Sequence, residues 1–196
     1  MLSQLAKRCV ELSYKHRLSH VSSVLNTVDL LDQIYHQRRD NEPVILDNGH
    51  ASLAHYVVLE SRGYCDAEEM IKKHGVHASR DMEHGIWCSN GSLGQAATVA
   101  LGMALADRDR KVWLVTSDGA CMEGCVWEVF RIAVDIKNLE VHIVCNGYGA
   151  YREIDIIDLP MWGEIHYCGR DYPSWLQGLA GHYLILNKEQ YEELVA

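Results

Sequence analysis

The sequence has very little phenylalanine and no long apolar run. Among its 196 residues there are one Phe, ten Tyr and five Trp, and no stretch of 18 or more apolar residues occurs, which excludes a transmembrane helix. Residues 1–20 carry charges inside their apolar stretch and therefore predict an amphipathic helix instead of a signal peptide. Because Tyr and Trp each carry a polar group, we expect some of them to line a wet interface or cleft.

Basic blocks and paired cysteines are absent as well. With 18 Lys and Arg against 27 Asp and Glu, the formal charge is −9, which argues against nucleic acid or a membrane as the partner. The seven cysteines include no CxxC pair, and such an odd set of thiols is typical of a reducing cytoplasm. Cys121 and Cys125 lie four residues apart without a second pair at ligand spacing, so buried thiols are expected there in place of a zinc site.

The apolar residues follow a rhythm typical of an α/β domain. The length suits a single domain over residues 1–196. Apolar segments of strand length alternate with helical patterns, which implies a mostly parallel sheet with helices on both faces. Strands are predicted at 44–46, 111–116, 141–145 and 182–186, and helices at 4–16, 26–37, 51–61, 67–73, 92–106, 123–136 and from 187 onwards. Asn26 or Thr27 is expected to cap the second helix, and residues 74–90 form a long loop of the kind that often carries function.

Polar residues follow two of the predicted strands directly. Ser117-Asp118-Gly119 follows the second strand and Asn146-Gly147 the third. In parallel α/β sheets ligands bind beyond the carboxyl ends of the strands. Asp118 and Asn146 would offer oxygen ligands to a hard cation there, and Gly119 would let the backbone approach a phosphate. Each pair alone is also compatible with an ordinary turn.

Two further features stand outside the strand ends. The segment Asn90 to Gln95 places two glycines and a serine before an Ala-rich helix, which suits either an anion or flat ring near the backbone or a close contact between helices. His20, His50 and His77 each follow a small or flexible stretch and could exchange protons near neutral pH. For the other histidines, His182 among them, we expect ordinary surface or core positions.

Together these segments resemble the N-terminal, diphosphate-binding domain of transketolase, over about residues 5–151. The matching motifs are Leu18-Ser19-His20 for the family's SGH, Asp47-Asn48-Gly49-His50 for SKGH, Gly75-Val76-His77 for the loop with GHP, Ser89 to Gln95 for STGSLGQG, Ser117-Asp118-Gly119 for GDG, Glu123-Gly124 with Trp127-Glu128 for EG…WE, and Asn146-Gly147 for the Asn that closes the metal motif. The combination is far more specific than any one motif. The tail, residues 152–196, diverges from the family, and Ser117 replaces the first Gly of GDG.

The resemblance implies a cofactor and a role for each matching residue. The cofactor would be thiamine diphosphate held through Mg²⁺ or Ca²⁺, and the reaction would move a two-carbon ketol unit from a ketose, or its phosphate, to an aldose. The implied metal ligands are Asp118, Asn146 and the backbone carbonyl of Tyr148. The implied cofactor contacts are His50, Gly91, Ser92, Leu93 and Gly119. The implied catalytic residues are His20 and His77, which would face the donor sugar, and Glu123, in a carboxylate network at the subunit junction.

The resemblance also implies a partner. In this family a second domain supplies the Glu that activates the aminopyrimidine of the cofactor, together with half of the pocket, and the sequence shows no counterpart of that domain. We therefore expect a split transketolase in the cytoplasm, in which a separate C-terminal subunit carries the pyrimidine domain and the two chains form a heterotetramer.

Three other interpretations stay open. The chain is alternatively a subunit of another thiamine-diphosphate enzyme, such as one like 1-deoxyxylulose-phosphate synthase, although the GSLGQ segment favours transketolase. It is alternatively a degenerate domain with a non-catalytic or regulatory role. A nicotinamide-binding domain is disfavoured because the GxGxxG fingerprint is missing.

Overall fold

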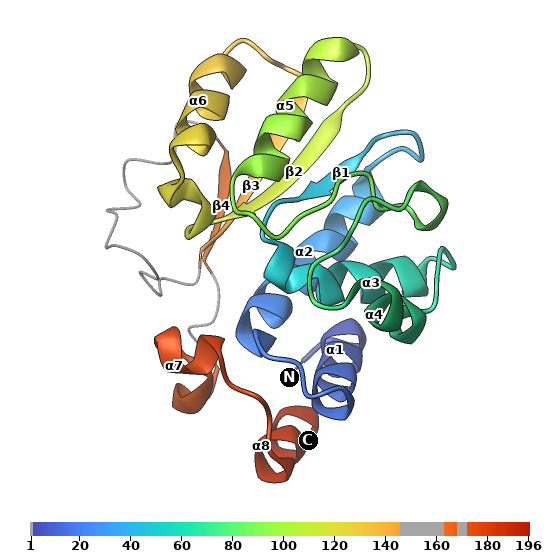
Figure 1. The fold of residues 1–196 in the computed structure, drawn as a ribbon, viewed down its shortest axis with the longest axis vertical. Helices are drawn as coiled ribbons and strands as arrows, with labels where there is room; N and C mark the ends of the chain where they lie inside the picture. Colours follow the sequence, from blue (N-terminus) through green and yellow to red (C-terminus); the bar gives the residue numbers. More distant parts are fainter. Residues whose placement is uncertain (1, 146–162, 168–171) are drawn as a thin grey trace.

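The computed structural model describes residues 2–145, 163–167 and 172–196, and a four-stranded parallel sheet lies at its centre (Figure 1). The strands lie side by side in chain order: β1 (Val44–Leu46), β2 (Val112–Ser117), β3 (Leu139–Cys145) and β4 (Glu164–Tyr167). All three neighbouring pairs are parallel. The predicted α/β class and the first three predicted strands are therefore confirmed.

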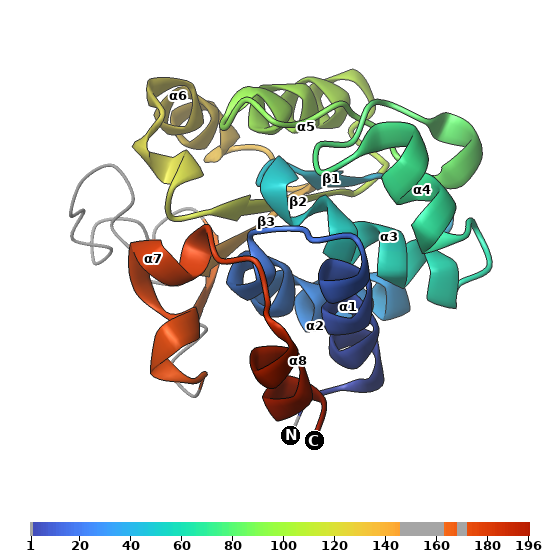
Figure 2. The same cartoon turned by 60° about the horizontal axis from the view of Figure 1, so that its bottom comes forward.

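Helices cover both faces of this sheet (Figures 1 and 2). One face carries α5 (Gln95–Ala106) and α6 (Gly124–Ala133), and the other carries α1 (Gln4–Lys15), α2 (Val21–Gln37) and α3 (Ser52–Ser61). On this second side α4 (Ala67–His74) packs against α3, α8 (Lys188–Val195) against α1, and α7 (Gly178–His182) against α2. No helix among the described residues has both the length and the apolar content needed to cross a bilayer.

The alternation of side chains along the strands produces two cores. Trp113, Val115 and Val144 point into the core shared with α1, α2 and α3. Leu114 and Ile143 point into the smaller core under α5 and α6. In that smaller core the buried alanines of α5 let this helix approach the sheet and α6 closely. Because both faces of β2 are covered, all six of its residues are buried.

The predicted strand at residues 182–186 is wrong. Helix α7 ends at His182, and the chain then runs extended to α8 without pairing with any described strand. Its period-two pattern is real, because Leu184 and Leu186 pack on the helical core while Tyr183 and Ile185 are exposed. The fourth strand is β4 instead, in the part of the sequence that showed no clear pattern. The predicted helix from residue 187 is confirmed, with Asn187 forming a capping box.

Two helix starts also differ from the prediction. Helix α2 begins at Val21, so Asn26 and Thr27 lie inside it, where Thr27 Oγ1 donates to the carbonyl of Ser23 at 2.7 Å. Buried serines in the first turn hide this start from a search for apolar periodicity. Helix α5 begins at Gln95 instead of Ser92, because Gly94 adopts a φ of +82° before the first turn. Residues 75–81 and 85–94 lie outside regular helices, and only the short turn Met82–His84 interrupts the predicted loop.

Candidate active site

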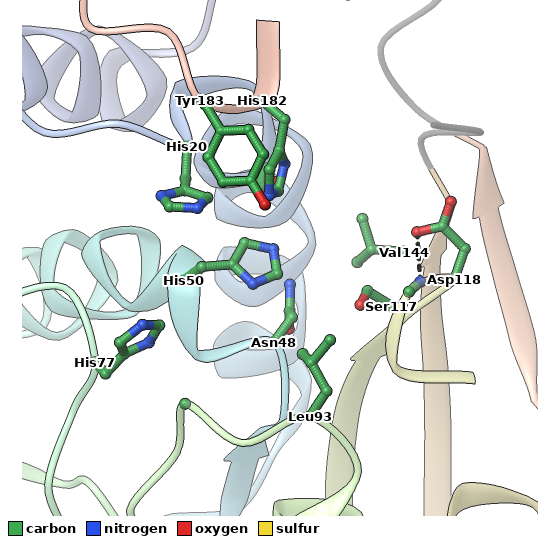
Figure 3. A pocket seen from close by; sticks show the side chains of 13 residues that line it. His20, Asn48, His50, His77, Leu93, Ser117, Asp118, Val144, His182 and Tyr183 are labelled. Atoms are coloured by element: carbon green, nitrogen blue, oxygen red, sulfur yellow. Dashed lines mark hydrogen bonds between the residues drawn. The ribbon is translucent and has the colours of Figure 1, made fainter. Parts of the chain in front are cut away.

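A cavity of about 190 Å³ opens between the carboxyl ends of β2 and β3 and the N-terminus of α2 (Figure 3). Segments from most of the chain contribute to its lining: His20, Ser23, Asn48, His50, His77, Gly91, Leu93, Ser117, Asp118, Gly119, Val144, His182 and Tyr183. Seven residues predicted for the site are among them, namely His20, His50, His77, Gly91, Leu93, Asp118 and Gly119. The fold therefore brings together segments that lie far apart in the sequence.

One side of the cavity is the strand-end wall, formed by Ser117, Asp118, Gly119 and Val144 (Figure 3). The Asp118 N–H donates to the carbonyl of Val144 at 3.0 Å, and the Asp118 carboxylate accepts from the Gly119 N–H at 2.9 Å. The Ser117 hydroxyl accepts from the Ala120 N–H at 3.2 Å. Ser117, which stands where the family motif GDG has its first glycine, therefore makes a hydrogen bond within the turn that follows β2.

The opposite side is the histidine wall, formed by His20, His50, His182 and Tyr183 (Figure 3). The centroid of the His182 ring lies 4.6 Å from that of His20 and 5.1 Å from that of His50, and the His20 and His50 rings are 5.3 Å apart. His20 is the N-cap of α2 with a φ of 66°, and its N–H donates to the carbonyl of His182 at 3.0 Å. Ser23 Oγ lies 3.2 Å from His182 Nδ1.

Burial and mutual proximity keep these rings neutral. Burial, followed by the nearby His182 and His77, lowers the pKa of His20 to about 4. Burial, followed by the neighbouring histidines, lowers the pKa of His50 to about 3, and burial also lowers the pKa of His182. At neutral pH each ring therefore offers one nitrogen that donates and one that accepts, which suits contact with hydroxyl groups.

His77 reaches the cavity from the loop that follows α4. The loop is attached through Ala78, whose N–H donates to Asn90 Oδ1 at 2.9 Å and whose carbonyl accepts from the Asn90 N–H at 3.0 Å. Asn90 packs so closely on Gly49 that a Cβ at position 49 would lie 2.5 Å from Asn90 Oδ1. Glycine at position 49 is thus needed to bring the predicted segments around His50, His77 and Gly91 together.

A buried carboxylate that sequence reasoning did not single out holds the start of α5. Asp47 is fully buried at the end of β1 and accepts from the N–H groups of Gly94 at 3.0 Å, Ala96 at 3.1 Å and Ala97 at 3.4 Å. It also accepts from Thr116 Oγ1 at 3.0 Å. Burial raises the pKa of Asp47, while these four hydrogen bonds act in the opposite direction. The sequence placed Asp47 at a strand end and in the motif around His50, but neither signal indicated its bonds to the start of α5.

Sequence reasoning also missed residues of the lining itself. His182 was expected at an ordinary position, and the structure corrects this: His182 and Tyr183 lie in the histidine wall, on a segment predicted as a strand. Asn48 lies beside them with its Nδ2 donating to Thr27 Oγ1 at 3.3 Å. Its buried Oδ1 has no hydrogen-bond partner among the described residues. Asn48 therefore joins the cavity lining to α2 through its amide nitrogen.

The remaining predicted residues have different positions. Ser92 is exposed and outside the lining, and Glu123 is exposed at the N-cap of α6, also outside the lining. Asn146 and Tyr148 lie outside the described residues. The roles predicted for these four residues, like those of the seven residues in the lining, stay predictions.

The donor set fits the implied cofactor and metal. An anionic carboxylate at Asp118 and the backbone of Gly119 lie on one side, and neutral imidazoles lie on the other. Carboxylate oxygen suits Mg²⁺ or Ca²⁺, and neutral histidines suit phosphate oxygens.

Comparison with known proteins agrees with this arrangement. The family model described as 1-deoxy-D-xylulose-5-phosphate synthase matches residues 2–151. An apulose-4-phosphate transketolase subunit of Phocaeicola vulgatus is 28% identical over 142 residues, which cover 62% of this chain and 50% of that protein. A 6-deoxy-6-sulfo-D-fructose transketolase subunit of a Clostridium species is 27% identical over 136 residues, covering 59% of this chain and 50% of that protein.

Solved structures show the same fold. The transketolase from Leishmania mexicana matches with a TM-score of 0.66 at 18% identity, over 81% of this chain and 30% of that one. The chain spans about half the length of these two curated relatives, and a smaller share of the Leishmania transketolase. It belongs to the family described as 1-deoxy-D-xylulose-5-phosphate synthase, among relatives that include transketolase subunits, and it has the fold of the transketolase diphosphate-binding domain.

Proposed function

We propose that the chain is the diphosphate-binding subunit of a transketolase that depends on thiamine diphosphate. It would transfer a two-carbon ketol unit from a ketose, or a ketose phosphate, to an aldose acceptor. The observation that carries this proposal is the convergence of His20, His50, His77, Asp118 and Gly119 on one cavity at the carboxyl ends of the strands. The transketolase names of the relatives support it.

In this proposal the strand-end wall holds the metal and the diphosphate. Asp118 would bind Mg²⁺ or Ca²⁺ together with Asn146 and the carbonyl of Tyr148. Gly119 and His50 would face the phosphates. The rings of the cofactor would lie against Gly91, Ser92 and Leu93. The cofactor, when bound, would supply the carbon nucleophile on which cleavage of the sugar depends.

The histidines would then orient the sugar and move its protons. His20 has a pKa of about 4 in the cavity, so it is neutral at neutral pH and can accept a hydroxyl hydrogen through one nitrogen. His77 is exposed on its loop, beside Gly91, and can approach the sugar from there. Placing a hydroxyl between two such groups supplies orientation as well as proton transfer.

We further propose a separate C-terminal subunit that carries the pyrimidine domain, in a heterotetramer. The word "subunit" in the names of the relatives supports a partner. The outer faces of α5 and α6 support it too, because this region exposes the apolar side chains Val99, Leu105, Trp127, Ile132 and Val134. Glu123 lies at the start of α6, close to this surface. A cytoplasmic location is supported by the free thiols of five described cysteines, namely Cys9, Cys65, Cys88, Cys121 and Cys125.

The family model favours a second candidate, the formation of 1-deoxy-D-xylulose 5-phosphate. The GSLGQ segment and the curated relatives favour ketol transfer instead. Assays of the assembled protein for each product separate the two candidates. A complex that assembles but binds no cofactor would point to the regulatory alternative.

The test is calorimetry with thiamine diphosphate and Mg²⁺, on the chain alone and in complex with a pyrimidine-domain chain from the neighbouring reading frame. We expect weak or no binding to the chain alone and tight binding to the complex. Asp118→Ala should abolish the dependence on Mg²⁺, because it removes the carboxylate ligand. Asp109→Ala, at an exposed carboxylate away from the cavity, is the matched control and should bind as the wild type does. Equal affinity of the Asp118→Ala complex would reject the proposed site.

A further inference from the structure

Two histidines and a glutamate gather on the sheet outside the cavity. His142 lies on β3, Glu164 and His166 lie on the neighbouring edge strand β4, and none of the three lines the cavity. In the parallel register His142 is paired with Glu164, and Val144 with His166. Since residues two apart share a face, the side chains at 142, 164 and 166 project from the same face of the sheet.

Their ligand atoms converge closely. His142 Nδ1 lies 3.0 Å from His166 Nε2. Glu164 Oε2 lies 3.6 Å from the first of these nitrogens and 3.9 Å from the second. The His142 ring is buried and stacks on Trp113, with centroids 5.9 Å apart and planes 11° apart. This stacking restrains the plane of the His142 ring.

These spacings match those of a metal centre. Tetrahedral Zn²⁺ holds histidine nitrogens and carboxylate oxygens at about 2.0–2.2 Å, which places neighbouring ligand atoms about 3.4 Å apart. The three separations therefore differ from the ideal by roughly half an ångström or less. Two imidazoles and one carboxylate leave a fourth position, and the Glu164 side chain, 67% exposed, opens that position to water.

A second cluster shows why this one is distinctive. Asp81, Glu83 and His84 also lie within ligand distance of one another. There, however, Asp81 is already paired with the Lys73 ammonium at 2.7 Å and with His74 at 3.1 Å. Within the described part of the chain, the ion-pair partners of Glu164 are the two histidines themselves. A cation would thus compete with a lysine at Asp81 but not at Glu164.

We propose that His142, Glu164 and His166 bind one Zn²⁺ ion, which ties the edge strand β4 to β3. Two imidazoles and a carboxylate suit a borderline-soft transition metal better than Mg²⁺ or Ca²⁺, which prefer shells of oxygen. The ion would cross-link two neighbouring strands through their side chains, in addition to the backbone pairing. This site is independent of the proposed function, and its metal differs from the one proposed at Asp118.

The test uses the full chain after treatment with a chelator. Titration with CoCl₂ should give one equivalent of a visible absorption band typical of tetrahedral or five-coordinate cobalt, without a thiolate charge-transfer band. ZnCl₂ should displace the cobalt and raise the melting temperature, because the ion binds only the folded state. MgCl₂ and CaCl₂ should do neither. A thiolate band would assign the ion to the cysteines and overturn the proposal.

Variants locate the site. Glu164→Gln alters an exposed side chain, so the protein should fold, and the affinity for Zn²⁺ should fall at least about tenfold, since even outer partners of metal ligands contribute 10- to 100-fold. The affinity of His166→Ala should fall at least as far. His84→Gln, in the second cluster, is the control and should bind Zn²⁺ as the wild type does. Unchanged affinity in both Glu164→Gln and His166→Ala would also overturn the proposal.

Discussion

The two walls of the cavity are held in place by different physical means. On the strand-end wall, Ser117 ends the fully buried strand β2 and Asp118 follows it, and the neighbouring Thr116 is bonded to the buried Asp47. On the histidine wall, His182 contacts His20 and His50 through their rings, and the hydrogen bonds of this wall include Ser19 to the His20 ring, the backbone bond from His20 to His182, and Ser23 to the His182 ring. Hydrogen bonds to buried groups therefore hold the strand-end wall, whereas contacts between rings contribute more to the histidine wall.

The largest effect is expected at Asp47. Asp47→Ala leaves three buried N–H groups and the Thr116 hydroxyl without an acceptor, at about 1–3 kcal/mol for each unsatisfied group. Allowing for partial relaxation, we expect a loss of about 3–5 kcal/mol in the free energy of unfolding, measured by urea denaturation. Thr116→Val, which removes one of the four bonds, should cost only about 1 kcal/mol. A loss below about 1 kcal/mol in Asp47→Ala would contradict the view that hydrogen bonds hold the strand-end wall more firmly than the histidine wall.

Acid should destabilise the fold through its buried neutral histidines, which include His20 and His50 in the histidine wall and His55 on α3. The folded pKa values of His20 and His50, about 4 and about 3, lie below that of a free histidine, so protons bind the unfolded chain more tightly. The free energy of unfolding should therefore fall as the pH drops from about 6.5 towards 4, by roughly a few kcal/mol in total. The experiment is urea denaturation at a series of pH values.

A second acid phase is expected from Asp81. Although burial would raise its pKa, hydrogen bonds from Lys73, His84 and His74 outweigh burial, and the pKa lies well below the usual range. The stability that Asp81 contributes is therefore present above the unfolded pKa near 4 and is lost as the pH falls further.

Two variants distinguish the acid phase of the histidines from that of Asp81. His50→Gln should lose part of the first phase and keep the second, whereas His36→Gln, at an exposed histidine, should keep both. If the free energy of unfolding of the wild type does not fall between about pH 6.5 and 4, protonation of these histidines does not destabilise the fold.

The smallest effect is expected at His182. His182→Ala removes the bond to Ser23 and the ring contacts but keeps the backbone bond from its carbonyl to His20. We expect a loss of about 1 kcal/mol in the free energy of unfolding, measured by thermal and urea denaturation. Tyr183→Ala is the control at a side chain that is 63% exposed, and it should cost less than about 0.5 kcal/mol. A loss in His182→Ala as large as that in Asp47→Ala would contradict the view that the strand-end wall is held more firmly.

The sequence predicted the sheet well where burial is complete. The apolar runs of β2 and β3 are typical of inner strands covered by helices on both faces. Because the two strands are parallel, the polar residues that follow them lie together at the carboxyl end of the sheet. By contrast, β4 contains Glu164 and His166 on an edge, so hydropathy gives no signal for it. Residues 183–186 alternate as a strand would, yet they pack on helices without a pairing strand among the described residues.

The site was predictable from motifs, whereas its supports were not. His20, His50, His77 and Asp118 could be named because each belongs to a segment that resembles a known family. His182 belongs to no such segment, and only the three-dimensional arrangement of α7 against α2 brings it to His20. Asp47 was part of a motif, but its bonds to the start of α5 depend on a contact across 47 or more residues that no local pattern encodes.

The backbone conformation of His20 favours glycine, whereas its place in the cavity supplies an imidazole. A φ of 66° is unfavourable for a residue with a Cβ, by about 1–2 kcal/mol, and glycine would adopt it freely. Glycine at this position would relieve the backbone but leave the cavity without its imidazole. At position 20 a residue that is best for the backbone and a residue that supplies an imidazole to the cavity are therefore different amino acids, so His20→Gly should separate backbone strain from the contribution of the ring.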